Sequence, residues 1–202
     1  MIPAREALAR LQEGNRRFTE SLAAGAGAQR KFELTEVREP MAIILGCSDA
    51  RVPAEIVFDQ GLGDLFVIRV AGNIVAPSQV ASIEFAAERF HTRLVVVLGH
   101  TQCGAVTAAL EELRLPAESR SRNLRAIVQR VSASVQGLYD GYDGPVTPKL
   151  VERGVRLNVR ASVNHLRHAS EVLEQLSEEA GLLVVGAEYA VETGRVDFFD
   201  VP

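Results

Sequence analysis

Short runs of aliphatic and β-branched residues recur along the chain, and each is typical of a strand buried on both faces of a sheet. Stretches with apolar residues at helical spacing separate these runs. We therefore predict an α/β fold with a central, mostly parallel sheet flanked by helices. The four parallel strands are expected at residues 41–46, 65–70, 94–98 and 182–187.

The predicted helices are marked by capping residues as well as by their apolar spacing. Ser78 is expected to cap a helix over 78–90, and Thr147 followed by Pro148 is typical of a helix start. The other helices are expected at 54–58, 104–113, 122–136, from Pro148 to about 166, and at 170–180.

The two ends of the chain differ from this alternating pattern. Residues 4–24 read as an amphipathic helix within an N-terminal arm, residues 1–28, which packs either on its own domain or on a partner subunit. At the other end, the tail alternates in polarity around Thr193 and Gly194, which is typical of a hairpin turn. We expect an antiparallel edge strand after this turn.

Composition narrows the class of protein. A chain of 202 residues is compatible with a single domain over 1–202, and its net charge of −4 offers no basic surface for nucleic acid. The sequence begins without a signal-peptide pattern and contains no apolar run long enough to cross a membrane. Two cysteines make no disulfide framework, so we expect a cytoplasmic protein.

Three metal-ligand side chains follow two of the predicted strands. Cys47 ends the first run, and His100 and Cys103 follow the third. Parallel strands end at the same edge of a sheet, so these side chains are expected to meet there. Two thiolates and one imidazole suit zinc, with a fourth position left for water as in catalytic sites. Buried packing of the cysteines is the alternative, and a disulfide between them on oxidation would destroy the site.

Asp49 and Arg51 follow Cys47 closely enough to lie beside such a metal. A bidentate contact with Arg51 would keep Asp49 ionised and off the metal. The Asp49 carboxylate could accept a hydrogen bond from a metal-bound water, or could itself take the open position. The alternative is a pair of surface residues that contributes little.

The remaining histidines are expected to be ordinary surface residues. His165 and His168 are three apart on a predicted helix, a spacing that could bind a metal, but no third ligand accompanies them. His91 precedes the third strand, where solvent exposure is expected.

These motifs resemble those of the β-class carbonic anhydrases. The resemblance rests on Cys47-Ser48-Asp49-Ala50-Arg51, on Gly99-His100-Thr101-Gln102-Cys103-Gly104, on residues 66–73, and on the Gly186-Ala187 and Thr193-Gly194 pairs. It implies a zinc lyase that interconverts carbon dioxide and bicarbonate, built as a homodimer or as a homotetramer of two dimers. It also implies an N-terminal helix that embraces the partner subunit and an active site close to the interface.

The resemblance also implies individual roles. Cys47, His100 and Cys103 would be the zinc ligands, and Asp49 and Arg51 the catalytic pair. Asp49 would be a fourth ligand in a closed state. The implied substrate contacts are Phe66, Phe85 and Gly104.

The chain departs from the family pattern at several positions. Ala50 replaces the usual Ser and Arg38 replaces a Gln. Phe85 replaces a Tyr, so the aromatic ring is present but the hydroxyl is absent. Ile44 stands where the anion-inhibited branch of the family has Trp, which argues against the same bicarbonate switch.

The mechanism expected from this site is attack of zinc-bound hydroxide on carbon dioxide, with Asp49 orienting the hydroxide and Phe66 lining a dry pocket. Two alternatives remain open. One is hydrolysis of carbonyl sulfide or carbon disulfide on the same scaffold, and the other is a non-catalytic zinc protein in which Asp49 closes the metal shell.

Overall fold

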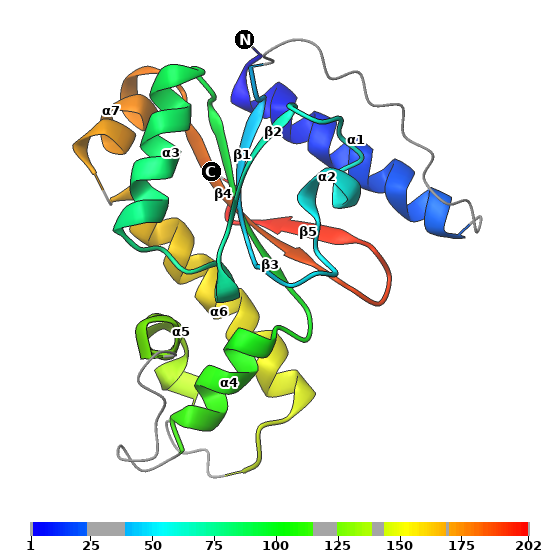
Figure 1. Ribbon diagram of the computed structural model, residues 1–202, viewed down its shortest axis with the longest axis vertical. Helices are drawn as coiled ribbons and strands as arrows, with labels where there is room; N and C mark the ends of the chain where they lie inside the picture. The colour runs from blue at the N-terminus through cyan, green and yellow to red at the C-terminus, as the bar shows by residue number, and fades with distance from the viewer. Residues whose placement is uncertain (1, 24–38, 115–124, 139–143, 169, 202) are drawn as a thin grey trace.

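A five-stranded sheet forms the centre of the molecule in a computed structural model, which describes residues 2–23, 39–114, 125–138, 144–168 and 170–201 (Figure 1). The strand order is β2-β1-β3-β4-β5. The first four strands run parallel, and β5 pairs antiparallel with β4. This confirms the predicted fold class. The strands are β1 Ala42–Gly46, β2 Leu65–Arg69, β3 Leu94–His100, β4 Leu183–Tyr189 and β5 Val196–Phe199.

Helices cover both faces of the sheet because strand residues alternate between two apolar clusters. Ile44 and Val96 belong to the cluster under α1 and α2, whereas Ile43 and Val95 belong to the cluster under α3, α6 and α7. Figure 1 shows these two groups of helices on opposite sides of the strands. The helices are α1 Ala4–Ala23, α2 Ala54–Val57, α3 Pro77–Arg89, α6 Pro148–Arg167 and α7 Glu171–Glu179.

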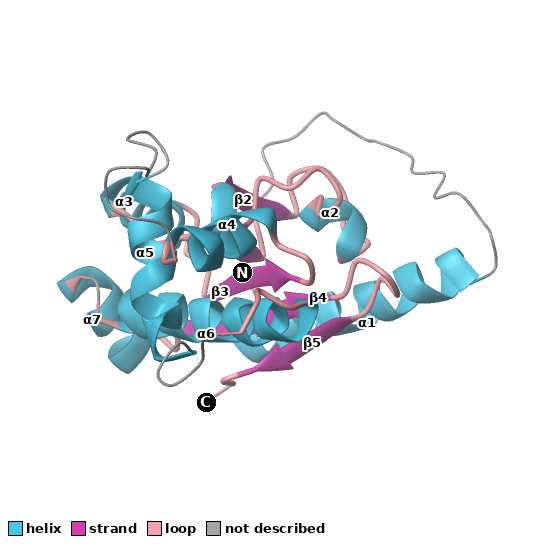
Figure 2. Ribbon diagram, turned by 90° about the horizontal axis from the view of Figure 1, so that it is seen from below, coloured by secondary structure: helices cyan, strands magenta, loops and turns pink. Residues whose placement is uncertain are grey.

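A third apolar cluster lies beyond the carboxyl ends of the parallel strands. It is built from α4 (Gly104–Glu112), α5 (Arg125–Val135) and the first half of α6, and it contains both Cys47 and Cys103. Figure 2 looks onto this end of the molecule, where α4, α5 and α6 lie together. Two short 3-10 turns, Ala71–Asn73 after β2 and Gln136–Leu138 after α5, belong to the same region.

The buried face of α1 packs on its own chain. Leu8 and Leu11 join the core beneath the sheet. The buried Asn15 amide donates to the carbonyls of Val57 and Gly194, each at 2.8 Å, and its oxygen accepts from the Val196 amide at 2.9 Å. These bonds tie α1 to α2 and to the β4–β5 hairpin. Contact of the exposed face of α1 with a partner subunit stays a prediction.

Some element boundaries differ from expectation, at α3 and at the ends of β3 and β4 in particular. Ser78 does not cap α3: the helix begins at Pro77, and the cap residue Ala76 makes no side-chain hydrogen bond. A proline at the first helical position has no N–H to satisfy, which reduces the need for a capping side chain. Strands β3 and β4 also continue to His100 and Tyr189, which pair with each other. By contrast, Thr147 caps α6 as predicted, accepting from the Leu150 amide at 3.2 Å.

Within the part of the chain that the structure describes, none of the helices has the length and apolar character that a membrane span requires.

Candidate metal centre

Cys47, His100 and Cys103 meet at the carboxyl edge of the sheet. Strands β1 and β3 are neighbours, with Gly46 paired to Leu98, so the residues that follow them converge. The sulfur atoms and a ring nitrogen of these three residues all lie within 4.8 Å of one another, and all three residues are buried. Among the described residues this is the one group of three or more potential ligands of this kind.

The His100 ring is oriented for ligation through Nε2. Its Nδ1 lies 2.8 Å from the Thr101 carbonyl, which can only accept, so Nδ1 carries the proton and Nε2 presents a lone pair. His100 is 0% exposed, and its Nε2 has no hydrogen-bond partner among the described residues. An orphaned, buried lone pair beside two sulfur atoms fits a metal ion, since a buried polar atom without a partner is otherwise costly.

The surroundings of the two sulfur atoms favour anionic sulfur. The Gly72 amide donates to Cys47 Sγ at 3.4 Å. Contact with the adjacent Cys103 thiol is the largest cause that lowers the pKa of Cys47. The same contact, together with burial, raises the pKa of Cys103, because two adjacent sulfurs cannot both ionise without a cation. Such a pair becomes fully ionised when a metal supplies positive charge.

Asp49 and Arg51 form the predicted pair at the mouth of the cluster. The guanidinium donates from Nε to Oδ1 at 2.9 Å and from Nη2 to Oδ2 at 2.8 Å. This contact holds the pKa of Asp49 well below its usual range, so the carboxylate is ionised at neutral pH. Oδ2 lies 3.9 Å from His100 Nε2. A carboxylate therefore stands beside the nitrogen that is free to bind a metal.

The family comparison agrees with this geometry. A family profile described as "Carbonic anhydrase" matches residues 42–196, most of the chain. The chain belongs to the β-class carbonic anhydrases.

Curated relatives of this carbonic anhydrase cover nearly its whole length. A carbonic anhydrase of Mycolicibacterium smegmatis is 37% identical over 190 residues, covering 93% of this chain and 89% of the relative. Carbonic anhydrase 2 of Mycobacterium tuberculosis is 36% identical over 191 residues, covering 92% of this chain and 87% of the relative. A solved tetrameric β-carbonic anhydrase of Sordaria macrospora superposes with a TM-score of 0.69 at 25% identity, covering 92% of this chain and 87% of that one.

Two residues beside the cluster were not anticipated from the sequence. Arg69, the last residue of β2, donates from Nε to the Cys47 carbonyl at 3.1 Å and from Nη2 to the Asp49 carbonyl at 2.6 Å. It therefore fixes the loop that carries both side chains. Gly72 follows β2 and supplies the amide to Cys47. Both could have been predicted, since β2 ends at the same sheet edge as β1.

A third unanticipated contact comes from the hairpin between β4 and β5. Glu192 accepts hydrogen bonds from the Thr101 hydroxyl at 2.8 Å and from the Gln102 amide. Thr101 Oγ1 in turn accepts from the Val191 amide at 3.0 Å. The sequence offered no signal for this contact, because it depends on how the hairpin folds back over the end of β3.

The residues assigned to substrate by resemblance lie in two places. Gly104 begins α4 directly after Cys103, and a side chain at this position would meet open space. Phe66 and Phe85 lie 6.3 Å apart between ring centres in a cluster with Phe90, and Phe85 is 54% exposed. This aromatic cluster, Phe66, Phe85 and Phe90, packs away from Cys47. Arg38 lies outside the described residues.

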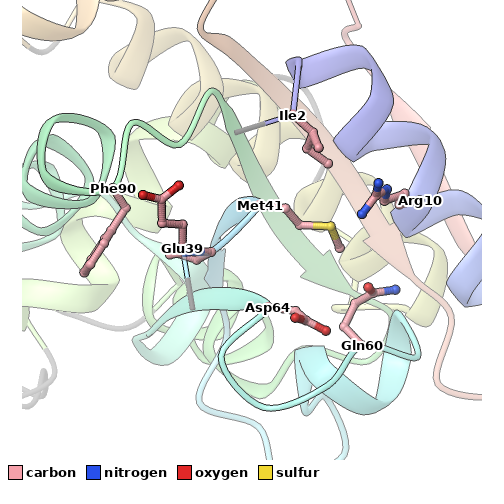
Figure 3. A pocket seen from close by; sticks show the side chains of 8 residues that line it. Ile2, Arg10, Glu39, Met41, Gln60, Asp64 and Phe90 are labelled. Atoms are coloured by element: carbon pink, nitrogen blue, oxygen red, sulfur yellow. The ribbon is translucent and has the colours of Figure 1, made fainter. Parts of the chain in front are cut away.

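A cavity of about 390 Å³ lies at the opposite edge of the sheet from the metal ligands. Met41 and Asp64, which precede β1 and β2, face into it together with Arg10 and Gln60 (Figure 3). Because it adjoins the amino ends of the strands, it is separate from the metal cluster.

The other histidines behave as expected. His91, His165 and His168 are exposed, and His168 lies 3.3 Å from the carboxylate of Glu174.

Proposed function

We propose that this carbonic anhydrase catalyses the zinc-dependent, reversible hydration of carbon dioxide to bicarbonate and a proton. The observation that carries the proposal is the buried cluster of two sulfur atoms and one unpartnered imidazole nitrogen, with the ionised Asp49 carboxylate at its mouth. Three protein ligands with solvent access at a fourth position is the arrangement of catalytic zinc, whereas structural zinc has four protein ligands.

Cys47, His100 and Cys103 would hold the zinc. Sulfur and imidazole are zinc's preferred donors, and the orphaned Nε2 of His100 has the orientation that ligation requires. Zinc bound there would make hydroxide available from water near neutral pH. Gly72, which donates to Cys47, would steady the ligand sulfur and the loop that carries it.

Asp49 would accept a hydrogen bond from the nucleophile and orient it towards substrate. It must stay ionised for this role, and the bidentate contact with Arg51 keeps it so. Arg51 also occupies both carboxylate oxygens, which opposes rotation of Asp49 into the metal position. The Gly104 amide, at the unsatisfied N-terminus of α4, would donate to the substrate oxygen.

The apolar wall for carbon dioxide would come from a second copy of the chain. Phe66 pairs with Ile43, four residues before Cys47, which places it about 13 Å from the ligand along the strand direction. Phe66 is therefore too far away to line its own site. Phe85 of α3 is exposed beside it, and an exposed aromatic ring next to the edge strand β2 suits burial against a partner.

The assembly and location follow from the same reasoning. A homodimer, or two dimers joined as a homotetramer, would bring the aromatic cluster of one subunit to the site of another, and the Sordaria macrospora relative is described as tetrameric. Residues 1–202 would form one domain with residues 1–28 as its arm. A reducing cytoplasm would keep Cys47 and Cys103 available as thiolates.

Stopped-flow measurement of carbon dioxide hydration, with zinc content determined on the same sample, tests the proposal. The wild-type protein should carry one zinc per chain and be active. Asp49→Ala should keep its zinc and lose about 100-fold in turnover, because an oriented proton acceptor is removed. Cys103→Ala should lose the zinc.

A zinc-replete wild-type protein that is inert at neutral and alkaline pH would contradict the proposal and favour a non-catalytic zinc protein. Faster hydrolysis of carbonyl sulfide or carbon disulfide than hydration of carbon dioxide would reassign the substrate. Unchanged turnover in Asp49→Ala would remove its assigned role.

A further inference from the structure

Glu192 lies outside the metal cluster yet contacts the segment between two of the proposed ligands. It comes from the β4–β5 hairpin, 90 residues from Gln102 in the sequence. Its two carboxylate oxygens accept from the Thr101 hydroxyl and from the Gln102 side-chain amide. The Thr101 contact lowers the pKa of Glu192, so the carboxylate is ionised at neutral pH. Glu192 belongs to none of the sequence stretches on which the resemblance to the family was based.

Gln102 connects Glu192 to Arg51. Its side-chain nitrogen donates to Glu192, and its side-chain oxygen accepts from Arg51 Nη1 at 3.4 Å. Its backbone carbonyl lies 3.4 Å from Arg51 Nη2 as well. A carboxylate can only accept and a guanidinium can only donate, so the amide has one favourable orientation between them.

The backbone of Gln102 is itself constrained. Its φ of 56° lies in the left-handed region, which is unfavourable for a residue other than glycine. Such a conformation persists only where surrounding contacts hold it. The hydrogen bonds that Thr101 and Gln102 donate to Glu192 are contacts of this kind, since they hold both residues of the turn to the hairpin.

Arg51 needs a second anchor if it is to hold Asp49 in one geometry. Its side chain is 47% exposed, and an exposed ion pair alone contributes little and leaves both side chains mobile. Contacts with both Asp49 and Gln102 restrict the guanidinium from two sides. A continuous series of hydrogen bonds therefore runs from the hairpin to the mouth of the metal cluster. Gln102 donates to Glu192, and Arg51 donates to both Gln102 and Asp49.

We propose that Glu192 is a positioning residue for the catalytic pair, acting through Gln102 to hold Arg51 and thereby to keep Asp49 in place beside His100. This inference rests on the proposed function, because that proposal assigns the role of Asp49. Without Glu192, Gln102 can leave its left-handed conformation and Arg51 loses one of its two anchors. Asp49 is then freer to rotate into the open metal position, where it competes with hydroxide.

The first test measures Arg51 directly and does not depend on activity. Hydrogen exchange of the Arg51 Nε–H is followed by ¹H–¹⁵N NMR on the protein as purified, with Arg51→Lys assigning the signal. Glu192→Ala should speed this exchange about tenfold, as expected from the loss of one charge-assisted contact in the series. Glu192→Gln, which keeps one acceptor, should fall between. Glu178→Ala, at an exposed acidic residue of α7, is the matched control and should leave the exchange unchanged.

The second test is the pH profile of turnover on samples with equal zinc content. Hydroxide competes better with a carboxylate as pH rises, so the loss in Glu192→Ala should be about tenfold at pH 7 and less than about threefold at pH 9. Glu192→Gln should recover part of the loss at pH 7. In a Gln102→Ala background, Glu192→Ala should have little further effect, because both act through one path.

Unchanged Arg51 exchange in Glu192→Ala would overturn the inference, whatever the activity. So would an equal loss of turnover at both pH values, or full additivity with Gln102→Ala. An inert but zinc-replete wild-type protein would instead refute the proposed function. In that case the NMR result still decides whether Glu192 positions Arg51.

Discussion

Replacing Gly72 by alanine perturbs a backbone amide that donates to Cys47 Sγ at 3.4 Å. Gly72 has a φ of 70°, and its carbonyl accepts from the Asn158 amide at 2.8 Å. An alanine Cβ would lie 3.2 Å from Ala105 Cβ and 3.3 Å from Val131 Cγ2. The substitution therefore combines backbone strain with crowding at the metal cluster.

The expected cost follows from these terms. A left-handed conformation costs alanine about 1–2 kcal/mol. The reduced entropy of the unfolded chain offsets about 0.4–1 kcal/mol of this. Two tight contacts in a packed region add about 1–3 kcal/mol. We expect the free energy of unfolding to fall by about 1–5 kcal/mol. Zinc affinity should fall about 10- to 100-fold as the amide moves away from Cys47.

Denaturant unfolding at fixed protein concentration and competition with a zinc chelator measure the two effects. Gly181→Ala is the matched control, because Gly181 also has a left-handed φ of 69° but a side chain there would meet nothing within 4 Å. It should lose about 1 kcal/mol or less and keep its zinc affinity. Equal zinc affinity in Gly72→Ala and the wild type would refute the role assigned to this amide.

Two further predictions concern the frame around the site. Asn15→Ala should lower the free energy of unfolding by about 2–4 kcal/mol, because it leaves two buried carbonyls and one amide without the Asn15 side chain as partner. Gln12→Ala, at an exposed position of α1, is the control and should be near neutral in the same denaturation assay. Equal effects of the two substitutions would show that the Asn15 hydrogen bonds do not hold α1 in place. Burial raises the pKa of Glu188 above its ordinary value of 4.5, despite the opposing effect of Arg156. As pH rises, the Glu188 carboxyl therefore ionises at a lower pH in the unfolded chain than in the folded protein. Its contribution to the free energy of unfolding falls above about pH 4.5 until the pKa of the folded state is reached. Denaturation of Glu188→Gln should show its stability relative to wild type increasing from pH 4.5 to 7, and a constant difference would show that burial does not govern this carboxyl.

Much of the site could be predicted because it depends on local features. Cys47 and His100 each follow an aliphatic run, and neighbouring parallel strands end at one edge, so their convergence followed from the pattern. Asp49 and Arg51 are two residues apart in one loop, which made their contact a short-range prediction.

The rest depends on geometry that no local pattern encodes. The contact of Glu192 with Gln102 requires a hairpin to return over the end of β3 and requires a left-handed residue between two ligands. The strand register sets the distance of Phe66 from Cys47, and apolar character alone could not reveal it. Ser78 was expected to cap α3 because serine is a common cap, whereas Pro77 begins the helix without one.

Zinc K-edge X-ray absorption of the purified protein tests the central claim most directly. If Cys47, Cys103 and His100 hold one ion and leave a position for solvent, the first shell should contain two sulfurs at ~2.3 Å and two lighter atoms at ~2.0–2.1 Å. Cys103→Ala should lose the zinc, and Asp49→Ala should leave the wild-type shell unchanged. A shell with fewer than two sulfurs, or a wild-type protein without zinc after purification in the absence of chelator, would contradict the account.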